Sequence, residues 1–269
     1  MGYLFDPANW EWIFAGRNFM FLLERFLNNI LLALVVMALS LILGLVIALL
    51  RISKNKVTSA VTGVWIDVWR NLPVLLVLLY FGLALPQEVK EFWVDIAPGF
   101  LPPQIKDSGQ VVASIIALTI YNSAVIAEIF RAGIQSLERG QGEAAAALGL
   151  PYWKAMRIVI LPQGLRRMVP ATVGQLITLT KDTSLVSILA IQELVAAGSI
   201  VNNTSGSPFG GTGVPAPILQ VYIVVGAMFV VFNLALSLLS RRLEVRERKR
   251  AGDVETVTGL EDQISIKPV

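Results

Sequence analysis

Residues 30–50 read ILLALVVMALSLILGLVIALL, a continuous apolar run without a charged side chain. A helix needs about 20 such residues to cross the ~30 Å hydrocarbon core of a bilayer, because each residue rises ~1.5 Å. The run therefore predicts a membrane-spanning helix. The whole chain has a matching composition, since 55% of its 269 residues are hydrophobic and only 15% are charged, against about 25% charged in an average soluble domain.

Four further segments have the length and hydrophobicity of membrane spans. The last of them is uncharged, whereas the other three hold charged side chains and would score lower on hydropathy alone. The sequence thus predicts an all-α integral membrane protein with about five transmembrane helices, at residues 30–50, 64–85, 111–129, 168–189 and 219–239.

Lys and Arg are unevenly distributed between the connecting segments. They gather between spans one and two, between spans three and four, and after span five, whereas residues 190–218 contain none. Because such residues concentrate in cytoplasmic loops, we expect the N-terminus outside and the C-terminus in the cytoplasm. The expected organisation is an extracytoplasmic or interfacial segment at 1–29, a transmembrane domain at 30–243 and a charged, disordered cytoplasmic tail at 244–269.

The chain contains no His and no Cys. This excludes disulfides, thiolate and imidazole metal sites, and catalytic arrangements that need either residue, so we predict no catalytic and no metal-binding residue. Two other functions stay open: a membrane-embedded enzyme that uses the carboxylates of Asp182, Glu128 or Asp67, and a self-sufficient channel or secondary transporter. Five spans without an internal repeat disfavour the latter.

Residues 136–162, between the third and fourth predicted spans, read SLERGQGEAAAALGLPYWKAMRIVILP. This pattern predicts two short helices joined by a turn, because the alanine run is strongly helix-forming. Ser136 suits the cap of the first helix, Gly149 its end and Pro151 the first turn of the next. Pro162 is expected to end the second helix. The small alanine side chains would let another protein approach closely.

The segment resembles the EAA loop of ABC-importer permeases, in which Glu-Ala-Ala, three residues, Gly, nine residues, Ile, one residue and Leu-Pro follow one another. Val159 stands at the Ile position, and the matching residues are Glu143, Ala144, Ala145, Gly149, Leu161 and Pro162. The stretches YNSAVIAEIFRAG before the loop and KDTSL after it are similar to those of polar-amino-acid permeases, most closely glutamate importers. Arg70-Asn71-Leu72-Pro73 matches the Arg-x-x-Pro of that family.

This resemblance implies a type I ABC importer permease fold and a dimeric membrane unit formed with a second permease subunit, identical or related. It also implies two cytoplasmic ATP-binding cassette subunits that bind ATP and Mg²⁺, and an extracytoplasmic amino-acid-binding protein. This chain would hold no cofactor, which agrees with its lack of a Gly-x-x-x-x-Gly-Lys-Ser/Thr phosphate loop. The EAA loop would form the coupling helix, with Gly140, Glu143, Ala144, Ala145, Gly149 and Pro151 at the ATPase contact.

Polar side chains inside the predicted spans are candidates for substrate binding. An ionisable group costs at least ~2.5–3.5 kcal/mol there, so it usually faces a partner or a wet cavity. Gln175, Thr178 and Asp182 are three, four and seven residues apart and share a helix face that could line a substrate cavity. The predicted substrate-binding residues are Gln175, Thr178, Asp182, Thr183, Ser184 and Asn122.

Two pairs of oppositely charged residues near the ends of spans have a simpler interpretation. Glu128 with Arg131, and Asp67 with Arg70, are each three residues apart on a predicted helix. Residues at this spacing are neighbours on a helix surface. We therefore expect each pair to neutralise itself at the membrane edge rather than to serve transport.

The substrate expectation comes from the positions ahead of the Lys-Asp-Thr-Ser stretch. The family resembled here often has Asn followed by Glu or Gln at these positions, which are Gly174 and Gln175 in this chain. In relatives that carry basic amino acids, a Glu at the second position joins the Asp of the stretch. An uncharged amide at Gln175 beside Asp182 lowers both the attraction for a cation and the repulsion of an anion. We expect import of glutamate first and glutamine second by alternating access, with a basic amino acid as the alternative.

Overall fold

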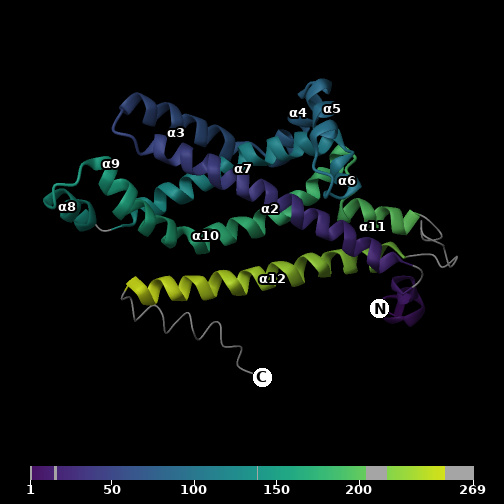
Figure 1. The fold of residues 1–269 in the computed structure, drawn as a ribbon. Helices are drawn as coiled ribbons and strands as arrows, with labels where there is room; N and C mark the ends of the chain where they lie inside the picture. Colours follow the sequence, from purple (N-terminus) through teal and green to yellow (C-terminus); the bar gives the residue numbers. More distant parts are fainter. Residues whose placement is uncertain (1, 15–16, 138, 204–216, 252–269) are drawn as a thin grey trace. The chain divides into compact units, whose positions relative to one another are not determined.

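In the computed structural model, every regular element of the described residues, 2–14, 17–137, 139–203 and 217–251, is a helix (Figure 1). The α-helices are α1 (Gly2–Phe5), α2 (Asn18–Arg51), α3 (Lys56–Asn71), α4 (Val74–Ala84), α5 (Gln87–Ile96), α6 (Pro103–Lys106), α7 (Gly109–Gln135), α8 (Arg139–Ala147), α9 (Tyr152–Ala155), α10 (Leu161–Asp182), α11 (Leu194–Asn203) and α12 (Ile218–Ala251). Three elements have other helical geometries: the 3₁₀-helices η1 (Pro7–Ile13) and η3 (Thr183–Leu189), and the π-helix η2 (Met156–Ile160).

Three helices in the described part of the chain are long and apolar enough to cross a membrane: α2, α7 and α12 as far as Glu247. Two bent pairs raise the number to five if each pair is one span, namely α3 with α4, and the helical stretch Tyr152–Leu189 with α11. The structure thus has three to five candidate membrane spans, and the predicted number of five lies within this range. The prediction of an all-α membrane fold is confirmed.

The second predicted span, residues 64–85, is not one continuous helix. α3 ends at Asn71 and α4 begins at Val74, with Leu72 and Pro73 in extended conformations between them. Proline lacks an N–H donor and disfavours the helical conformation of the residue before it. The helix therefore breaks at Pro73, and the expectation of a single helix was wrong there.

The described residues group into two compact units, each assembled from three stretches of chain. Unit 1 comprises residues 1–36, 73–119 and 179–233, and unit 2 comprises residues 37–72, 120–178 and 234–269. The core of unit 1 joins the N-terminal part of the chain to α11 and α12; its buried members are Trp12, Phe21, Leu22, Phe26, Leu194, Ala197, Val201, Val221 and Val225. This packing explains why α2 starts at Asn18, ahead of the apolar run that begins at Ile30.

Unit 2 relies on glycines for close contacts between helices. A Cβ atom on Gly44 of α2 would lie 2.6 Å from the Ile126 side chain of α7, and one on Gly133 of α7 would clash with Met168 of α10. Small residues let helix backbones approach closely in membrane proteins, where packing rather than the hydrophobic effect drives association. The glycines thus fix α7 against both α2 and α10 in this unit.

α12 continues past the expected domain boundary at residue 243 and ends at Ala251. Residues 241–250 read RRLEVRERKR, and Arg, Leu, Glu and Lys are strong helix formers. The first part of the predicted tail, residues 244–251, is therefore helical. The rest of the predicted tail, residues 252–269, lies outside the described residues.

Candidate functional site

The predicted coupling segment forms α8, a turn, α9 and η2 within unit 2, and α8 and α9 lie side by side (Figure 1). Gly149 has a φ of 73°, the left-handed conformation that glycine adopts without steric cost. The N–H of Leu150 donates to the carbonyl of Ala145 at 3.0 Å, and the N–H of Gly149 donates to that of Ala146 at 2.9 Å. These two bonds form a Schellman motif. The predicted helix end at Gly149 is confirmed.

Ser136 does not cap α8 as the sequence suggested. Its hydroxyl donates to the carbonyl of Gly133 at 2.8 Å, because the last carbonyls of a helix such as α7 have no intrahelical partner. Its own carbonyl accepts a hydrogen bond from the Arg167 guanidinium at 2.6 Å. Ser136 therefore belongs to the end of α7 and links it to α10.

Pro162 does not end a helix, contrary to the expectation. η2 runs directly into α10, and Pro162 is the second residue of α10. In the wider turn of η2 the N–H of Leu161 reaches back to the carbonyl of Met156. A proline inside an α-helix loses a hydrogen bond and clashes with the carbonyl four residues earlier, so a π-turn just before it relieves both conflicts. At Pro162 the helix thus changes from π to α geometry and does not break.

The candidate coupling residues differ in accessibility. Glu143, Ala144, Gly149 and Pro151 are exposed, whereas Ala145 is only 3% exposed and packs inside the chain. Gly140 lies in α8 with them. Ala145 is thus unsuited to direct contact with another protein, and its small size serves the packing of α8 itself.

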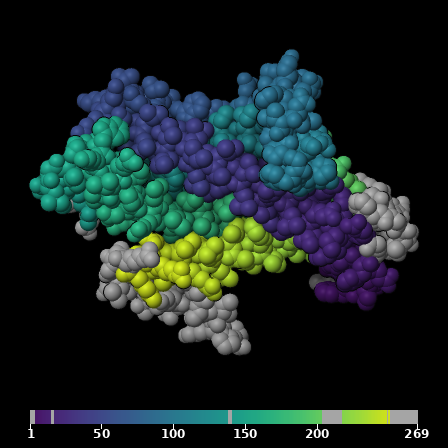
Figure 2. All heavy atoms as spheres, in the orientation of Figure 1, coloured from purple at the N-terminus to yellow at the C-terminus, as the bar shows by residue number. Residues whose placement is uncertain are grey.

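One face of α8 points away from unit 2. Ala144, Ala147 and Leu148 are three and four residues apart, so they share a helix face, and all three are exposed. Leu148 is 79% exposed. We call these three residues the outward face of α8; the teal surface of this region is uncovered in the view of Figure 2. Leu148 was missed in the sequence, although its spacing of four from Ala144 signals it.

An apolar surface beside α8 was also missed. In α9, Trp153 is 75% exposed, and the Tyr152 ring carries the Lys54 ammonium 4.7 Å from its centroid. A cavity of about 140 Å³ opens there, lined by Leu49, Ile52, Ser53, Lys54, Tyr152, Trp153 and Met156. The segment therefore offers aromatic as well as small apolar surface for contact.

Gly149→Val is expected to destabilise the turn after α8. Valine must then adopt the left-handed conformation, which costs about 1–2 kcal/mol for an ordinary residue and more for a β-branched one. At roughly 2–4 °C per kcal/mol for a chain of this size, the melting temperature of the purified protein should fall by about 2–8 °C. The matched control is Gly142→Ala in α8, because a Cβ there meets nothing within 4 Å. Equal melting temperatures for the two variants would contradict the role of Gly149.

Within unit 2 the structure brings together two predicted substrate-binding residues. The Gln175 amide of α10 donates to the Asn122 side-chain oxygen of α7 at 2.7 Å. Asn122 is fully buried, whereas Gln175 is half-buried. Thr178 is exposed, and its hydroxyl makes a long bond of 3.5 Å to the carbonyl of Gly174. The amide pair joins residues 53 positions apart, which no local pattern could reveal.

The remaining candidates, Asp182, Thr183 and Ser184, follow one another at the junction of α10 and η3 in unit 1. The hydroxyls of Thr183 and Ser184 donate to the carbonyls of Thr180 and Lys181 at 2.8 and 2.7 Å. Thr183 is fully buried, and Asp182 is half-buried. Among the described residues, no donor lies within hydrogen-bonding distance of the Asp182 carboxylate. Asp182 is therefore the candidate whose charge is available to a ligand.

The two charged pairs near the ends of spans have different outcomes. Arg131 and Glu128 form an ion pair of 2.7 Å with several hydrogen bonds, as predicted, and Gln135 accepts a further bond from Arg131. Asp67 and Arg70 are exposed and form no ion pair within 4 Å in the part of the chain that the structure describes. The expected pairing of Asp67 with Arg70 was therefore wrong.

Glu193 is a buried carboxylate that the sequence reading missed. It is 3% exposed and accepts hydrogen bonds from the Asn29 amide at 3.1 Å and from the N–H groups of Val195 and Ala196 at 2.9 and 2.8 Å. A carboxylate that accepts the first N–H groups of a helix satisfies donors that would otherwise lack a partner. Glu193 caps α11 and ties it to α2 in unit 1. Its position directly before Leu194 is the only sequence signal.

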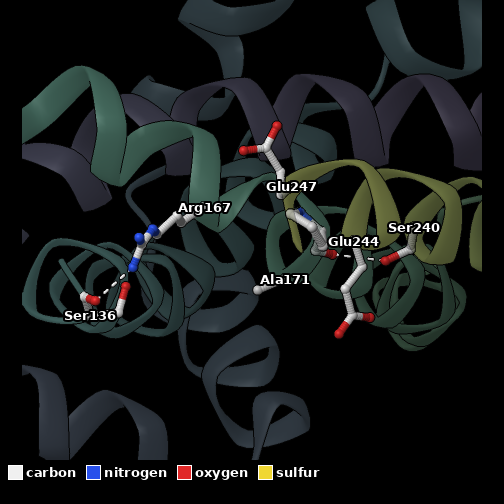
Figure 3. A pocket seen from close by; sticks show the side chains of 7 residues that line it. Ser136, Arg167, Ala171, Ser240, Glu244 and Glu247 are labelled. Atoms are coloured by element: carbon white, nitrogen blue, oxygen red, sulfur yellow. Dashed lines mark hydrogen bonds between the residues drawn. The ribbon is translucent and has the colours of Figure 1, made fainter. Parts of the chain in front are cut away.

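A cavity of about 670 Å³ in unit 2 contains none of the predicted substrate-binding residues. Figure 3 shows it, lined by Ser136, Arg167, Pro170, Ala171, Ser240, Glu244 and Glu247. The Ser240 hydroxyl of α12 donates to the Pro170 carbonyl of α10 at 2.9 Å. No group of three His, Cys, Asp or Glu side chains suited to a metal ion occurs among the described residues.

A family model described as "Binding-protein-dependent transport system inner membrane component" matches residues 40–249. The chain is 35% identical over 236 residues to the probable glutamine ABC transporter permease protein GlnP of Bacillus subtilis (strain 168), a match that covers 87% of this chain and 97% of that protein. It is 28% identical over 240 residues to the glutamate/aspartate import permease protein GltK of Escherichia coli O6:H1, covering 88% and 97%.

Two further comparisons bear on substrate and fold. The arginine transport system permease protein ArtQ of Bacillus subtilis (strain 168) is 29% identical over 232 residues, covering 83% of this chain and 91% of that protein. A solved structure described as an amino acid ABC transporter with histidines matches with a TM-score of 0.66 at 28% identity, covering 84% of this chain and 94% of that chain. The similarity thus extends over most of the chain and includes relatives named for different amino acids.

Proposed function

Because the chain belongs to the family of binding-protein-dependent inner-membrane transport components, as a permease subunit of an amino-acid ABC transporter, we propose that it imports glutamate or glutamine. It is a multi-pass protein of the inner membrane. It is not an enzyme, since separate ATPase subunits hydrolyse ATP in such transporters. The alternative function of a membrane-embedded enzyme is therefore rejected.

The observation that carries the substrate proposal is the Asp182 carboxylate, half-buried and without a hydrogen-bond donor among the described residues. A carboxylate in this state favours the ammonium group that all amino acids share. In this proposal the uncharged Gln175 amide, which donates to Asn122, interacts with the substrate side chain. An uncharged amide accepts either a carboxylate or an amide side chain, and it lacks the second negative charge that would favour a cation.

Uptake of labelled glutamate, glutamine and arginine by the complete transporter, with its ATPase and binding protein, tests this proposal. We expect glutamate and glutamine to be transported in preference to arginine. Gln175→Glu should lower glutamate uptake more than glutamine uptake, because like charges repel. Gln175→Asn is the matched control, since it keeps the amide. A preference for arginine would overturn the substrate proposal, and equal losses of both substrates would show that Gln175 does not contact the side chain.

The partners follow from the family and from the exposed surface of unit 2. ABC importers of this family work with ATPase subunits and a binding protein. We propose two cytoplasmic ATPase subunits that bind ATP and Mg²⁺, a second permease subunit, identical or related, and an extracytoplasmic amino-acid-binding protein. The outward face of α8 is the proposed contact with an ATPase subunit, supported by exposed Ala144, Ala147 and Leu148.

The proposed orientation puts the N-terminus outside and the C-terminus in the cytoplasm, as the distribution of Lys and Arg favours. The chain is free of cysteine, so single cysteines report their own positions. Phe100→Cys, at an exposed site between α5 and α6, should react with a membrane-impermeant maleimide on intact cells, and Ala146→Cys in α8 should react only after permeabilisation. The reverse pattern would invert the topology.

A further inference from the structure

We propose that one face of α12, at the end of its apolar span, binds the headgroups of anionic phospholipids. This face consists of Arg242 and Arg246, with Lys249 as a weaker member, and we call it the cationic face. The inference rests on the membrane span of α12 and not on the identity of the transported amino acid.

The first support is the division of charge around α12. Arg242, Arg246 and Lys249 are four and three residues apart and exposed. Ser240, Glu244 and Glu247 repeat the same spacing and line the cavity of Figure 3. The two sets are offset by two residues, which is about 200° around a helix of 3.6 residues per turn. Arg242 and Arg246 therefore lie on the side of α12 away from the cavity-lining carboxylates, whereas Arg241, three residues before Glu244, does not belong to the cationic face.

The second support is the continuity of the cationic face with exposed apolar residues. Leu234 and Leu238 precede Arg242 at intervals of four residues, so they lie on the same side of α12, and they are 58% and 40% exposed. Only 6% of the apolar span of α12 is buried within the chain. This helix face thus changes from apolar to cationic where the span ends. A bilayer changes in the same order, from apolar acyl chains to charged headgroups.

The third support is the distance along the helix. Arg242 lies about 6 Å beyond Leu238 and Arg246 about 12 Å beyond it, at ~1.5 Å per residue. The headgroup layer on each side of a bilayer is about 5–8 Å thick. Arg242 reaches it directly, and the long side chain of Arg246 can extend back toward it. Lys249 is a further ~4–5 Å away along the axis, so its contribution is smaller.

A fluorophore on Leu238→Cys, in this otherwise cysteine-free chain, measures which lipid contacts the face. The transporter complex is reconstituted in bilayers of phosphatidylcholine and phosphatidylglycerol at 7:3, with bromine quenchers on the acyl chains of one lipid or the other. We expect stronger quenching by brominated phosphatidylglycerol than its share of the bilayer predicts. Each cation near an anionic surface contributes about 1 kcal/mol, equivalent to about fivefold, so Arg242→Gln and Arg246→Gln should each reduce the preference by up to that factor.

Controls separate this site from a general effect of charge. Arg157→Gln removes an exposed cation from η2 and should leave the preference unchanged, while Arg242→Lys should retain most of it. ATP hydrolysis by each purified complex confirms that the variants assemble. Equal quenching by both lipids, or an unchanged preference in the double variant Arg242→Gln/Arg246→Gln, would overturn the proposal. Absence of quenching by either lipid would mean that another protein subunit covers the face, which also overturns it.

Discussion

Asp182→Asn is expected to lower amino-acid uptake by about 10- to 100-fold. A hydrogen bond to a charged group is worth about 1.5–3 kcal/mol, and each 1.4 kcal/mol corresponds to about tenfold. Asparagine has nearly the same shape as aspartate, so the variant removes the charge that would hold the substrate ammonium and little else. Uptake by the reconstituted transporter, measured against substrate concentration, gives the size of the loss.

The matched control is Asp67→Asn in α3. Asp67 is also a carboxylate on a membrane helix, but it is exposed and has no ion pair with Arg70. We expect Asp67→Asn to transport normally. Basal ATP hydrolysis should survive in both variants, because neither residue lies in the coupling segment. Normal uptake by Asp182→Asn would remove Asp182 from the substrate site and leave the family assignment intact.

Ala144→Trp is expected to reduce uptake about 5- to 150-fold by blocking the ATPase contact. An indole on the outward face of α8 would keep α8 and the ATPase subunit from approaching closely. Overpacking a tight contact costs about 1–3 kcal/mol. Ala144 is exposed in the isolated chain, so the fold itself has room for the larger side chain. The variant should therefore be made at normal levels yet recover less ATPase subunit on purification.

Ala144→Ser is the matched control at the same position, since it adds one oxygen atom and keeps the close approach. It should couple ATP hydrolysis to uptake normally. Ala145→Trp is a poor probe, because Ala145 is 3% exposed and a large ring there would disturb α8. If Ala144→Trp retains both the ATPase subunit and uptake, the outward face of α8 does not form the contact.

The apolar runs predicted most of the fold because the bilayer imposes a simple requirement of length and hydrophobicity. The sequence did not show where helices change type. It predicted a single helix through Pro73, where the helix breaks, and a helix end at Pro162, where η2 intervenes and the helix continues. Every proline removes one backbone hydrogen-bond donor. Whether the helix breaks there depends on the hydrogen bonds of the residues before the proline, and the amino-acid sequence alone does not specify these bonds.

The candidate site was predictable in part. Spacing along one helix placed Gln175, Thr178 and Asp182 in α10, and the motif identified the turn at Gly149. Contacts between helices were not predictable, because they join distant residues: Gln175 with Asn122, and Glu193 with Asn29. The exposure of Leu148 and the burial of Ala145 were likewise hidden, since both depend on how α8 packs in unit 2.

The π-helix η2 has a consequence for insertions and deletions in this chain. A π-turn contains one residue more than an α-helical turn would need over the same rise. Deleting Val159 within η2 would convert the π-turn into an α-helical turn of the same rise, so α8 and α9 would keep nearly the same direction relative to α10. Deleting one residue from the regular helix of α10 would instead turn α8 and α9 by about 100° about the axis of α10 and draw them ~1.5 Å closer. The outward face of α8 therefore tolerates a one-residue deletion in η2, whereas the same deletion in α10 would redirect that face without altering any residue on it.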